Sequence, residues 1–436
     1  MKILYEMTYS TRGQSGIPRD ASTLAKILLN TEGVDPDFIL NPRSYTKRKN
    51  PKSSGLQWSS NELGDTLRKD PGRSALPPIV LRLLILVQSL SFRRIVAKVK
   101  LDSMQKANVS KFLHLDNSPK KFSDRNVFLL SISYIARFTR PRFLKPFRVR
   151  TEDYSLFIQQ QVDPIQVDKK TTHIVRLHDF LPISHPQYFD QNGVKVFSKS
   201  LRVMLSGRQK VWVMDSESTA EEFRNYFGGH LDVRVIPCVV EVNRSHEVES
   251  RKKKNQVCMV NTIEPRKRIY LAIAGFREAK DTRKIPKDWE LLIVGSEGWQ
   301  EQTLVANLRR QIFGKDIIFR EGVPDFELEK IYSESKIVLS TSAAEGFGLP
   351  PLEGMAYGCL PVVSDIPQHR ETVKDLGLYF KGDSPQKVAE KLGESYIILT
   401  ENGKNLANKM IEYVQSNYSQ DVIGKRWLDL FMDVQK

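Results

Sequence analysis

Residues 337–364 read IVLSTSAAEGFGLPPLEGMAYGCLPVVS, with a short aliphatic run on either side of a glycine-containing loop and a helical stretch. The runs at 337–340 and 361–364 have the apolar, β-branched character of buried strands. Residues 350–357 begin with a proline, which the first turn of a helix tolerates. A strand, a helix and a second strand in this order form the repeating unit of a parallel sheet, so the stretch predicts an α/β fold.

The same alternation extends along the chain in both directions. In the second half it predicts strands at 257–260, 290–295 and 317–319, and helices at 269–278, 302–313 and 325–333. In the first half it predicts strands at 3–7, 173–177, 211–214 and 233–236. It also predicts a helix at 17–30 and a second helix that follows residues 216–219 and ends at residue 227. We therefore predict two Rossmann-like, doubly wound domains.

The domain boundaries follow from the polar segment between these halves. Residues 241–256 contain the basic run RKKK and are predicted to link a first domain, 1–240, to a second domain, 257–405. Residues 406–436 are predicted to form terminal helices that pack back toward the first domain. Residues 31–164 give no regular pattern, so their structure and role are left unassigned.

Composition excludes several classes of protein. The chain has 436 residues, 40% of them hydrophobic and 27% charged, which is the composition of a globular protein and not of a fibrous or disordered one. Three scattered cysteines, Cys238, Cys258 and Cys359, suggest neither a disulfide framework nor a zinc site. The N-terminus reads MKILYE, a first strand and not a signal peptide, so we expect a cytoplasmic protein.

The net charge of +16 favours an anionic partner, which leaves nucleic acid, an acidic lipid surface and phosphorylated small molecules open. Residues 79–111 carry seven basic side chains against one acidic side chain, interleaved with aliphatic residues. Such a stretch either lies on an anionic membrane surface or forms an ordinary core helix with a solvated basic face. Its longest apolar stretch, residues 79–90, is too short to span a bilayer.

Two carboxylates in the opening stretch are candidates for ligand contacts. Glu345 follows a predicted strand, at the sheet edge where ligands of doubly wound folds bind, and Glu353 is predicted in the first turn of the following helix. Gly346 and Gly348 allow close approach of a ligand to the backbone, and a helix start favours phosphate. The alternative for Glu353 is a first-turn glutamate that only complements the helix dipole.

The stretch from Glu345 to Glu353 is similar to the E-x7-E segment of retaining glycosyltransferases of family 4, which have the GT-B fold of two facing Rossmann-like domains with a cleft between them. The resemblance implies that Glu345 faces the donor sugar and that Glu353 binds the nucleotide ribose. The segment from Glu264 to Lys267, EPRK, resembles the family segment whose lysine binds the donor diphosphate, which implies that role for Lys267. Many relatives carry a second basic residue where this chain has Asn261, and Arg266 or Arg268 could substitute for it.

Further segments carry the resemblance. His178 lies in a segment similar to the family's strand-end H-D segment, where the histidine lies beside the donor sugar, whereas His173 is predicted to be structural. Gly16 corresponds to the glycine-containing turn near the donor phosphate, and Val323 to the turn under the nucleobase. The resemblance thus implies Glu345 and His178 as catalytic residues, and as donor-binding residues Lys267, Arg266, Glu353, Gly346, Phe347, Gly348, Gly16 and Val323.

The function implied is transfer of a sugar from a nucleoside diphosphate sugar to a glycan or lipid-linked glycan acceptor in surface polysaccharide assembly. GDP-mannose is the first expected donor and dTDP-rhamnose the second. No D-x-D segment is placed as a metal site, so no cofactor and no obligatory metal are expected. The alternatives are a basic nucleic-acid-binding protein, although no nucleic-acid module is recognisable, and a GT-B protein of other chemistry, such as an epimerase or phosphorylase.

Overall fold

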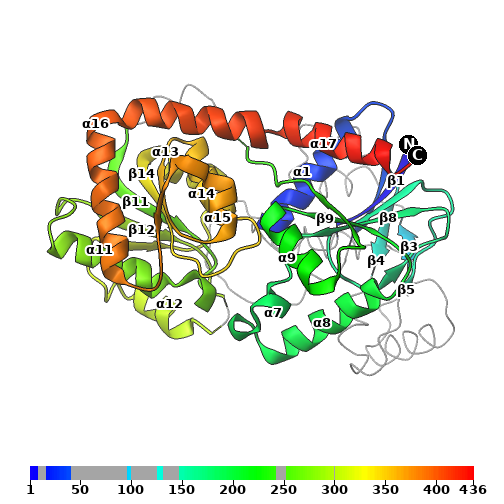
Figure 1. Ribbon diagram of the computed structural model, residues 1–436, viewed down its shortest axis with the longest axis horizontal. Helices are drawn as coiled ribbons and strands as arrows, with labels where there is room; N and C mark the ends of the chain where they lie inside the picture. The colour runs from blue at the N-terminus through cyan, green and yellow to red at the C-terminus, as the bar shows by residue number, and fades with distance from the viewer. Residues whose placement is uncertain (8–15, 41–95, 100–124, 131–146, 242–251, 299) are drawn as a thin grey trace, which may run out of the picture.

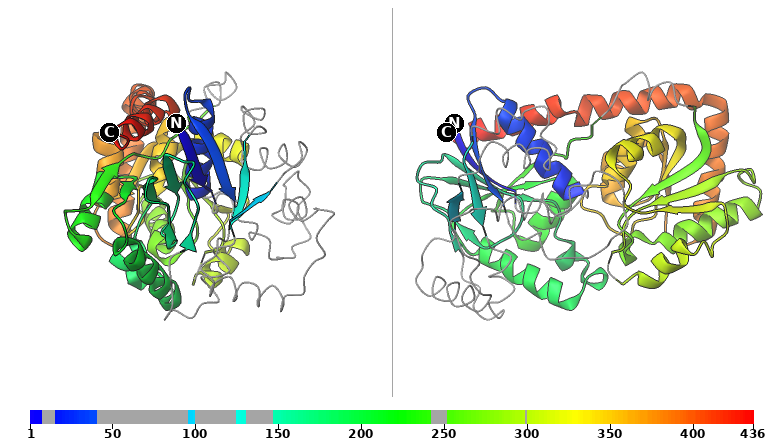
Figure 2. Two further views of the ribbon diagram at one scale, coloured as in Figure 1. Left: turned by 90° about the vertical axis from the view of Figure 1, so that its right-hand side faces the viewer. Right: turned by 180° about the vertical axis from the view of Figure 1, so that it is seen from behind.

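The computed structural model describes residues 1–7, 16–40, 96–99, 125–130, 147–241, 252–298 and 300–436, which form two α/β domains side by side (Figure 1). Each domain is built on one largely parallel sheet, as the alternation of strands and helices predicts. The two termini lie next to each other on the first domain (Figure 2).

The sheet of the first domain has eight strands in the order β10-β9-β8-β6-β1-β2-β4-β3. Its neighbouring strands are parallel except for the pair of β3 and β4 at one edge. The strands are β1 (Lys2–Glu6), β2 (Asp35–Leu40), β3 (Val96–Val99), β4 (Val127–Leu130), β6 (Leu156–Gln159), β8 (Thr172–Leu177), β9 (Val211–Met214) and β10 (Asp232–Val235), with β5 (Phe147–Arg148) and β7 (Ile165–Gln166) in a separate pair. The described helices are α1 (Gly16–Asn30), α7 (Leu181–Ser184), α8 (Gln191–Leu205) and α9 (Glu217–Phe227), with a 3-10 turn, η2 (Pro186–Tyr188).

The sheet of the second domain has six strands, all parallel, in the order β13-β12-β11-β14-β15-β16. They are β11 (Lys254–Val260), β12 (Glu290–Val294), β13 (Ile317–Arg320), β14 (Ser335–Ser340), β15 (Leu360–Ser364) and β16 (Leu378–Phe380). The helices are α11 (Ile269–Asp281), α12 (Gln302–Arg309), α13 (Asp325–Glu334), α14 (Leu349–Ala356), α15 (Pro367–Val373), α16 (Pro385–Tyr418) and α17 (Gln420–Asp433), with 3-10 turns η3 (Pro265–Lys267) and η4 (Lys374–Leu376).

The C-terminal helices connect the two domains. Helix α16 packs on α11 and bends at Asn402, whose backbone leaves the helical conformation, and then runs across to the first domain (Figure 1). There α17 buries Trp427 and Phe431 against Ile3, Tyr5 and other residues of the first-domain core. The chain therefore ends as part of the domain in which it begins.

Several elements differ from the sequence prediction. Helix α16 begins at Pro385, well before the predicted terminal helices at 406, and the bend at Asn402 separates its two halves. Helix α12 ends at Arg309 and not at 313, because Gln311 takes a positive φ of 54° that an α-helix cannot continue through. Strand β11 begins at Lys254, inside the predicted linker. Strand β6, in the unassigned segment, lies buried between β8 and β1.

The basic stretch at 79–111 lies outside the described residues except for β3, whose backbone is a strand at the sheet edge and not part of a helix. Among the helices that the structure describes, none is both long enough and apolar enough to cross a membrane.

Candidate active site

The loop after β14 places Glu345 at the carboxyl edge of the second sheet, as predicted. The Glu345 side chain is buried, with a relative exposure of 6% for the residue. Its Oε2 accepts a hydrogen bond of 2.8 Å from Arg266, and its Oε1 accepts one from Nζ of Lys267. Both cations come from η3, the turn between β11 and α11, so the two motifs that the sequence singles out in this domain meet at one carboxylate.

The charges at this contact shift one another's pKa. Burial alone would raise the pKa of Glu345, but Lys267 and Arg266 outweigh it and hold the pKa well below its ordinary value. Burial and the neighbouring Arg266 guanidinium lower the pKa of Lys267, against the pull of Glu345. Glu264 lies 2.7 Å from Nε of Arg266 and adds a second carboxylate to the group. Two carboxylates thus balance two cations, and Glu345 is ionised at neutral pH.

The glycines after Glu345 bring the second domain against the first. A Cβ on Gly346 would lie 2.6 Å from the backbone oxygen of His178 and 2.9 Å from Cβ of Asp179, so only glycine fits there. Gly348 has a φ of 88°, a left-handed conformation that favours glycine, and caps α14. The structure thus gives Gly346 a close contact between the domains, and its predicted contact with a ligand stays a prediction.

Glu353 does not lie in the first turn of its helix, where the sequence analysis predicted it. Helix α14 begins at Leu349, so Glu353 is its fifth residue and lies beyond the first turn, which holds no acidic residue. A dipole-complementing glutamate is therefore excluded as its explanation. Its Oε1 accepts a 2.8 Å hydrogen bond from Arg19 of the first domain, and its Oε2 accepts one of 2.8 Å from the hydroxyl of Tyr332.

His178 directly follows β8, at the carboxyl edge of the first sheet as predicted, and its backbone oxygen lies close to Gly346 of the second domain. Its contact with the donor sugar stays a prediction. Its Nδ1 lies 2.9 Å from Oδ2 of Asp215, and its Nε2 lies 3.0 Å from Oε1 of Gln160. Burial disfavours the imidazolium, but the Asp215 carboxylate outweighs it and raises the pKa of His178 above its ordinary value. His173 is buried and bonded to Gln159, and burial lowers its pKa to about 3, which fits the structural role predicted for it.

The turn between β9 and α9 forms a second contact between the domains. The hydroxyls of Ser216 and Thr219 donate to the backbone oxygen of Gly346 over 2.9 and 2.8 Å. Glu371 of α15 accepts hydrogen bonds of 2.7 and 2.8 Å from the backbone N–H groups of Glu217 and Ser218. A carboxylate of the second domain thus caps a helix of the first, where the helix dipole favours a negative charge.

Two of the other predicted donor-binding residues, Val323 and Gly16, lie at or just before the beginning of helices, whereas the third, Phe347, lies in a core. Val323 lies in the turn between β13 and α13, half-buried against the core below it, and Gly16 opens α1, the helix that carries Arg19. Phe347 is 6% exposed and packs with Tyr418 in the core of the second domain, with ring centroids 5.9 Å apart. The Phe347 side chain is therefore part of this core, and its contact with a ligand stays a prediction.

Sequence reasoning missed Arg19, Asp215 and Glu371. Each acts across the tertiary structure on a partner more than thirty residues away, and no local spacing connects the pairs. The one signal in the sequence is the SES run at 216–218, typical of a helix start, which marks α9 but not the carboxylate that caps it.

One group of residues has the composition of a metal site. Within the described part of the chain, ligand atoms of Asp20, His178 and Cys238 lie within 4.8 Å of one another. The buried guanidinium of Arg176 already pairs with Asp20 over 3.1 Å and contacts Cys238. A bound cation would lie next to this buried positive charge, so the group does not fit a metal ion well.

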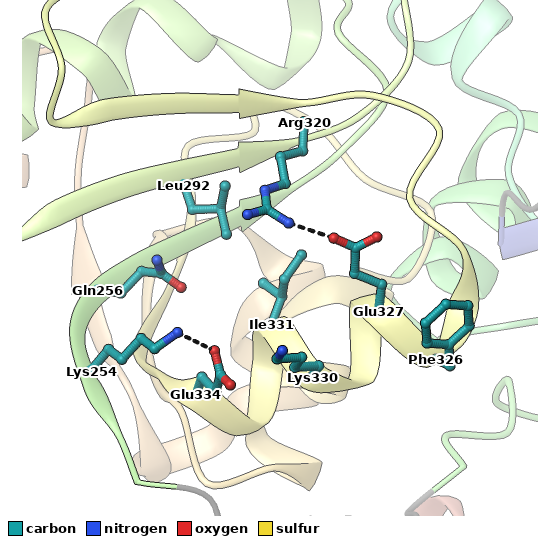
Figure 3. Close-up of a pocket in the computed structure, with 9 residues that line it drawn as sticks. All are labelled: Lys254, Gln256, Leu292, Arg320, Phe326, Glu327, Lys330, Ile331 and Glu334. Carbon is teal, nitrogen blue, oxygen red and sulfur yellow. Dashed lines mark hydrogen bonds and ion pairs between the residues drawn. The ribbon is translucent and has the colours of Figure 1, made fainter. Parts of the chain in front are cut away.

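A separate hollow of about 240 Å³ lies between α13 and strands β11 to β13 (Figure 3). Two of its cations are already paired, Lys254 with Glu334 and Arg320 with Glu327. Because these charges are neutralised within the hollow, it does not have the character of a phosphate site. Residues predicted to bind the nucleotide sugar lie elsewhere, around Glu345.

Comparison with known proteins gives the second domain a family match. Residues 242–417 match the family model described as glycosyl transferases group 1. The serotype-specific mannosyltransferase WbdA of Escherichia coli is 24% identical over 270 residues, which cover 57% of this chain and 32% of that protein. The O-antigen chain mannosyltransferase RfbU of Salmonella typhimurium is 26% identical over 212 residues, covering 48% of this chain and 56% of that protein.

The first curated relatives are therefore much longer, and the matched part spans about a third of their length.

Among solved structures, Alr3699/HepE of Anabaena in complex with UDP has a TM-score of 0.61 at 14% identity, with 99% of this chain and 100% of that chain covered. Sucrose-phosphate synthase of Thermosynechococcus elongatus has a TM-score of 0.61 at 14% identity, with 100% and 99% covered. The likeness confirms the predicted GT-B architecture of two Rossmann-like domains.

Proposed function

We propose, from the match of residues 242–417 to the group 1 glycosyl transferases, that the protein is a glycosyltransferase of the GT-B fold that transfers a hexose from a nucleoside diphosphate sugar with retention of configuration. The proposed acceptor is a glycan or lipid-linked glycan of surface polysaccharide assembly. Mannose is the favoured sugar because WbdA and RfbU, which match over 270 and 212 residues, are named as mannosyltransferases.

The contact set of Glu345 carries the proposal. A buried carboxylate, ionised and held by Lys267 and Arg266, lies at the carboxyl edge of the second sheet. The adjacent Gly346 contacts His178 at the end of a first-domain strand. Sugar transfer needs both signs of charge at one place, because positive charge develops on the sugar while negative charge develops on the leaving diphosphate.

Each residue then has a distinct part in the reaction. Glu345 stabilises the positive charge at the anomeric carbon, and Lys267 with Arg266 takes up the charge of the departing diphosphate. The N–H groups at the start of α14 add a positive dipole end. His178, oriented by Asp215, contacts the same sugar ring, and the acceptor hydroxyl replaces the nucleoside diphosphate on the anomeric carbon.

The test is turnover of GDP-mannose, with dTDP-rhamnose and UDP-glucose as alternative donors, in the presence of a polyprenyl-linked glycan. Glu345→Gln keeps the shape of the side chain but removes its charge, and we expect a loss of about 100-fold or more in kcat. Glu334→Gln, which removes the partner of Lys254 on the far end of β11, serves as the control. Turnover of Glu345→Gln within threefold of the wild type would contradict the assignment, as would absence of any turnover in the wild type.

Nucleic-acid binding, the other reading of the net charge, finds no support in a GT-B architecture or in the family match. Attachment to an anionic membrane surface through residues 79–111 remains part of the proposal, since a lipid-linked acceptor would be presented there.

A further inference from the structure

Asn261 directly follows β11, the strand next to β14 in the sheet, so it lies at the same carboxyl edge as Glu345. It also opens the loop that ends in Lys267. The backbone of Asn261 is fixed on both sides. Its N–H donates to the backbone oxygen of Val294 over 2.9 Å, and a Cβ added to the neighbouring Gly295 would lie 1.9 Å from its carbonyl oxygen.

The side chain of Asn261 is unusual in having no partner. The residue is 8% exposed, yet neither Nδ2 nor Oδ1 makes a hydrogen bond within the part of the chain that the structure describes. Three other polar groups at this edge of the sheet are engaged. Lys267 and Arg266 bond to Glu345, and the hydroxyl of Thr341 donates to the backbone oxygen of Lys267 over 2.8 Å.

A buried amide without partners is costly to the folded protein, because both its donor and its acceptor have lost water. Such a group is retained where a ligand supplies the missing bonds. The ligand has to offer a hydrogen-bond acceptor to Nδ2 and a donor to Oδ1. A phosphate oxygen only accepts, so it would leave Oδ1 unsatisfied. A sugar hydroxyl both donates and accepts, and vicinal hydroxyls fit a carboxamide well.

The charges around the site favour the same ligand. Lys267, Arg266, Glu345 and Glu264 already balance one another, and the neutral carboxamide adds no charge that would attract phosphate. Contacts to the diphosphate are left to the two cations. Asn261 is free to recognise an uncharged part of the donor.

We propose that Asn261 binds a hydroxyl of the donor's hexose and so contributes to selection of the sugar. The inference rests on the proposed function, because it takes the ligand to be a nucleoside diphosphate sugar. It predicts a residue that strengthens binding of the sugar conjugate but not of the nucleoside diphosphate alone. It also predicts that the side chain lowers the stability of the ligand-free protein.

The experiment compares Asn261→Leu with the wild type in two measurements. The first is the Tm of the ligand-free protein. We expect it to rise by about 2 °C, because leucine has nearly the same shape and leaves no buried polar group without a partner. The second is the Kd for GDP-mannose and for GDP by calorimetry. We expect affinity for GDP-mannose to fall about tenfold and that for GDP to change less than about twofold.

Gln256→Leu is the matched control, since Gln256 is a buried amide at the other end of β11. Its Oε1 accepts a 3.0 Å hydrogen bond from the hydroxyl of Ser335, so the same substitution there should lower Tm and leave both affinities unchanged.

Each alternative outcome has a definite meaning. A fall in Tm for Asn261→Leu would show that the amide has a structural partner in solution, and this overturns the inference. Equal losses for GDP and GDP-mannose would place the contact on the nucleotide and overturn it as well. If the wild type binds none of GDP-mannose, dTDP-rhamnose and UDP-glucose, the proposed function itself fails before any variant is compared, and the inference fails with it.

Discussion

Arg19 of α1 and Glu353 of α14 belong to different domains, and the guanidinium donates a 2.8 Å hydrogen bond to Oε1 of the carboxylate. The other oxygen of Glu353 accepts from Tyr332, so both are occupied. Arg19 also pairs with Asp325, which begins the helix after the Val323 turn. One first-domain side chain thus holds both elements that are proposed to bind the nucleoside. A ribose that bonds to Glu353 has to compete with Arg19.

Removal of Arg19 should therefore strengthen nucleotide binding. We expect Arg19→Ala to raise the affinity for GDP by about threefold, a modest effect because the Arg19 side chain is one-third exposed and its ion pairs are partly screened. Calorimetric titration with GDP measures this directly. Arg234→Ala, which breaks ion pairs within the first domain, is the control and should leave the affinity unchanged. A weaker affinity in Arg19→Ala would mean that the arginine contacts the nucleotide.

The cap that Glu371 places on α9 should hold the domains together. Glu371→Ala removes acceptors from two backbone N–H groups, and we expect it to lower the free energy of unfolding by about 1 kcal/mol and to increase the radius of gyration of the ligand-free protein in solution scattering. Asp190 caps α8 entirely within the first domain by accepting from Gly193 over 2.8 Å. Asp190→Ala should cost similar stability without any change in radius. If both variants keep the wild-type radius, Glu371 is only a local cap.

The sequence predicted what depends on local pattern. The strand at 211–214 and the helix at 325–333 agree with β9 and α13 to within one residue, because buried β-branched runs and helix-start residues act over a few positions. The motif around Glu345 placed it correctly at the sheet edge for the same reason.

Relations between distant segments could not be predicted in this way. Helix α14 begins at Leu349, one residue before the predicted start at 350, and this places Glu353 outside the first turn. The burial of Phe347 depends on Tyr418, which lies 71 residues later at the end of a helix whose first half the periodicity did not reveal. Arg19 and Glu353 are joined only because two separately folded domains meet.

Membrane attachment is a prediction that depends on sequence alone. In residues 79–111 the basic side chains Arg93 and Arg94 stand beside Phe92 and Ile95, and each basic residue near an anionic leaflet contributes about 1 kcal/mol. We expect the protein to co-sediment with vesicles of anionic but not neutral phospholipid, and to be released at high salt.

The variant R93E with R94E should lose most of this binding. The exposed pair Lys404 and Lys409 on α16 provides the control, since their change to glutamate alters net charge equally in the second domain. Equal binding to neutral and anionic vesicles, or equal losses in both variants, would contradict a site at 79–111.

The two first-domain histidines should differ in how they link stability to pH. The Asp215 carboxylate raises the pKa of His178 above its ordinary value of 6.5, against the effect of burial. A raised pKa in the folded state means that the protonated ring stabilises the protein below pH 6.5 and that this contribution is lost as pH rises through the folded-state pKa. His173 has its pKa lowered to about 3 by burial, so above about pH 7.5 it is neutral in both folded and unfolded chains and contributes no slope. We expect the difference in unfolding free energy between wild type and His178→Gln, measured by urea titration from about pH 6 to 9, to shrink as pH rises. The difference for His173→Gln should change in the opposite sense, growing up to about pH 7.5 as the unfolded imidazole loses its proton and staying constant above it. A pH-independent difference for His178→Gln would mean that Asp215 does not hold the imidazolium.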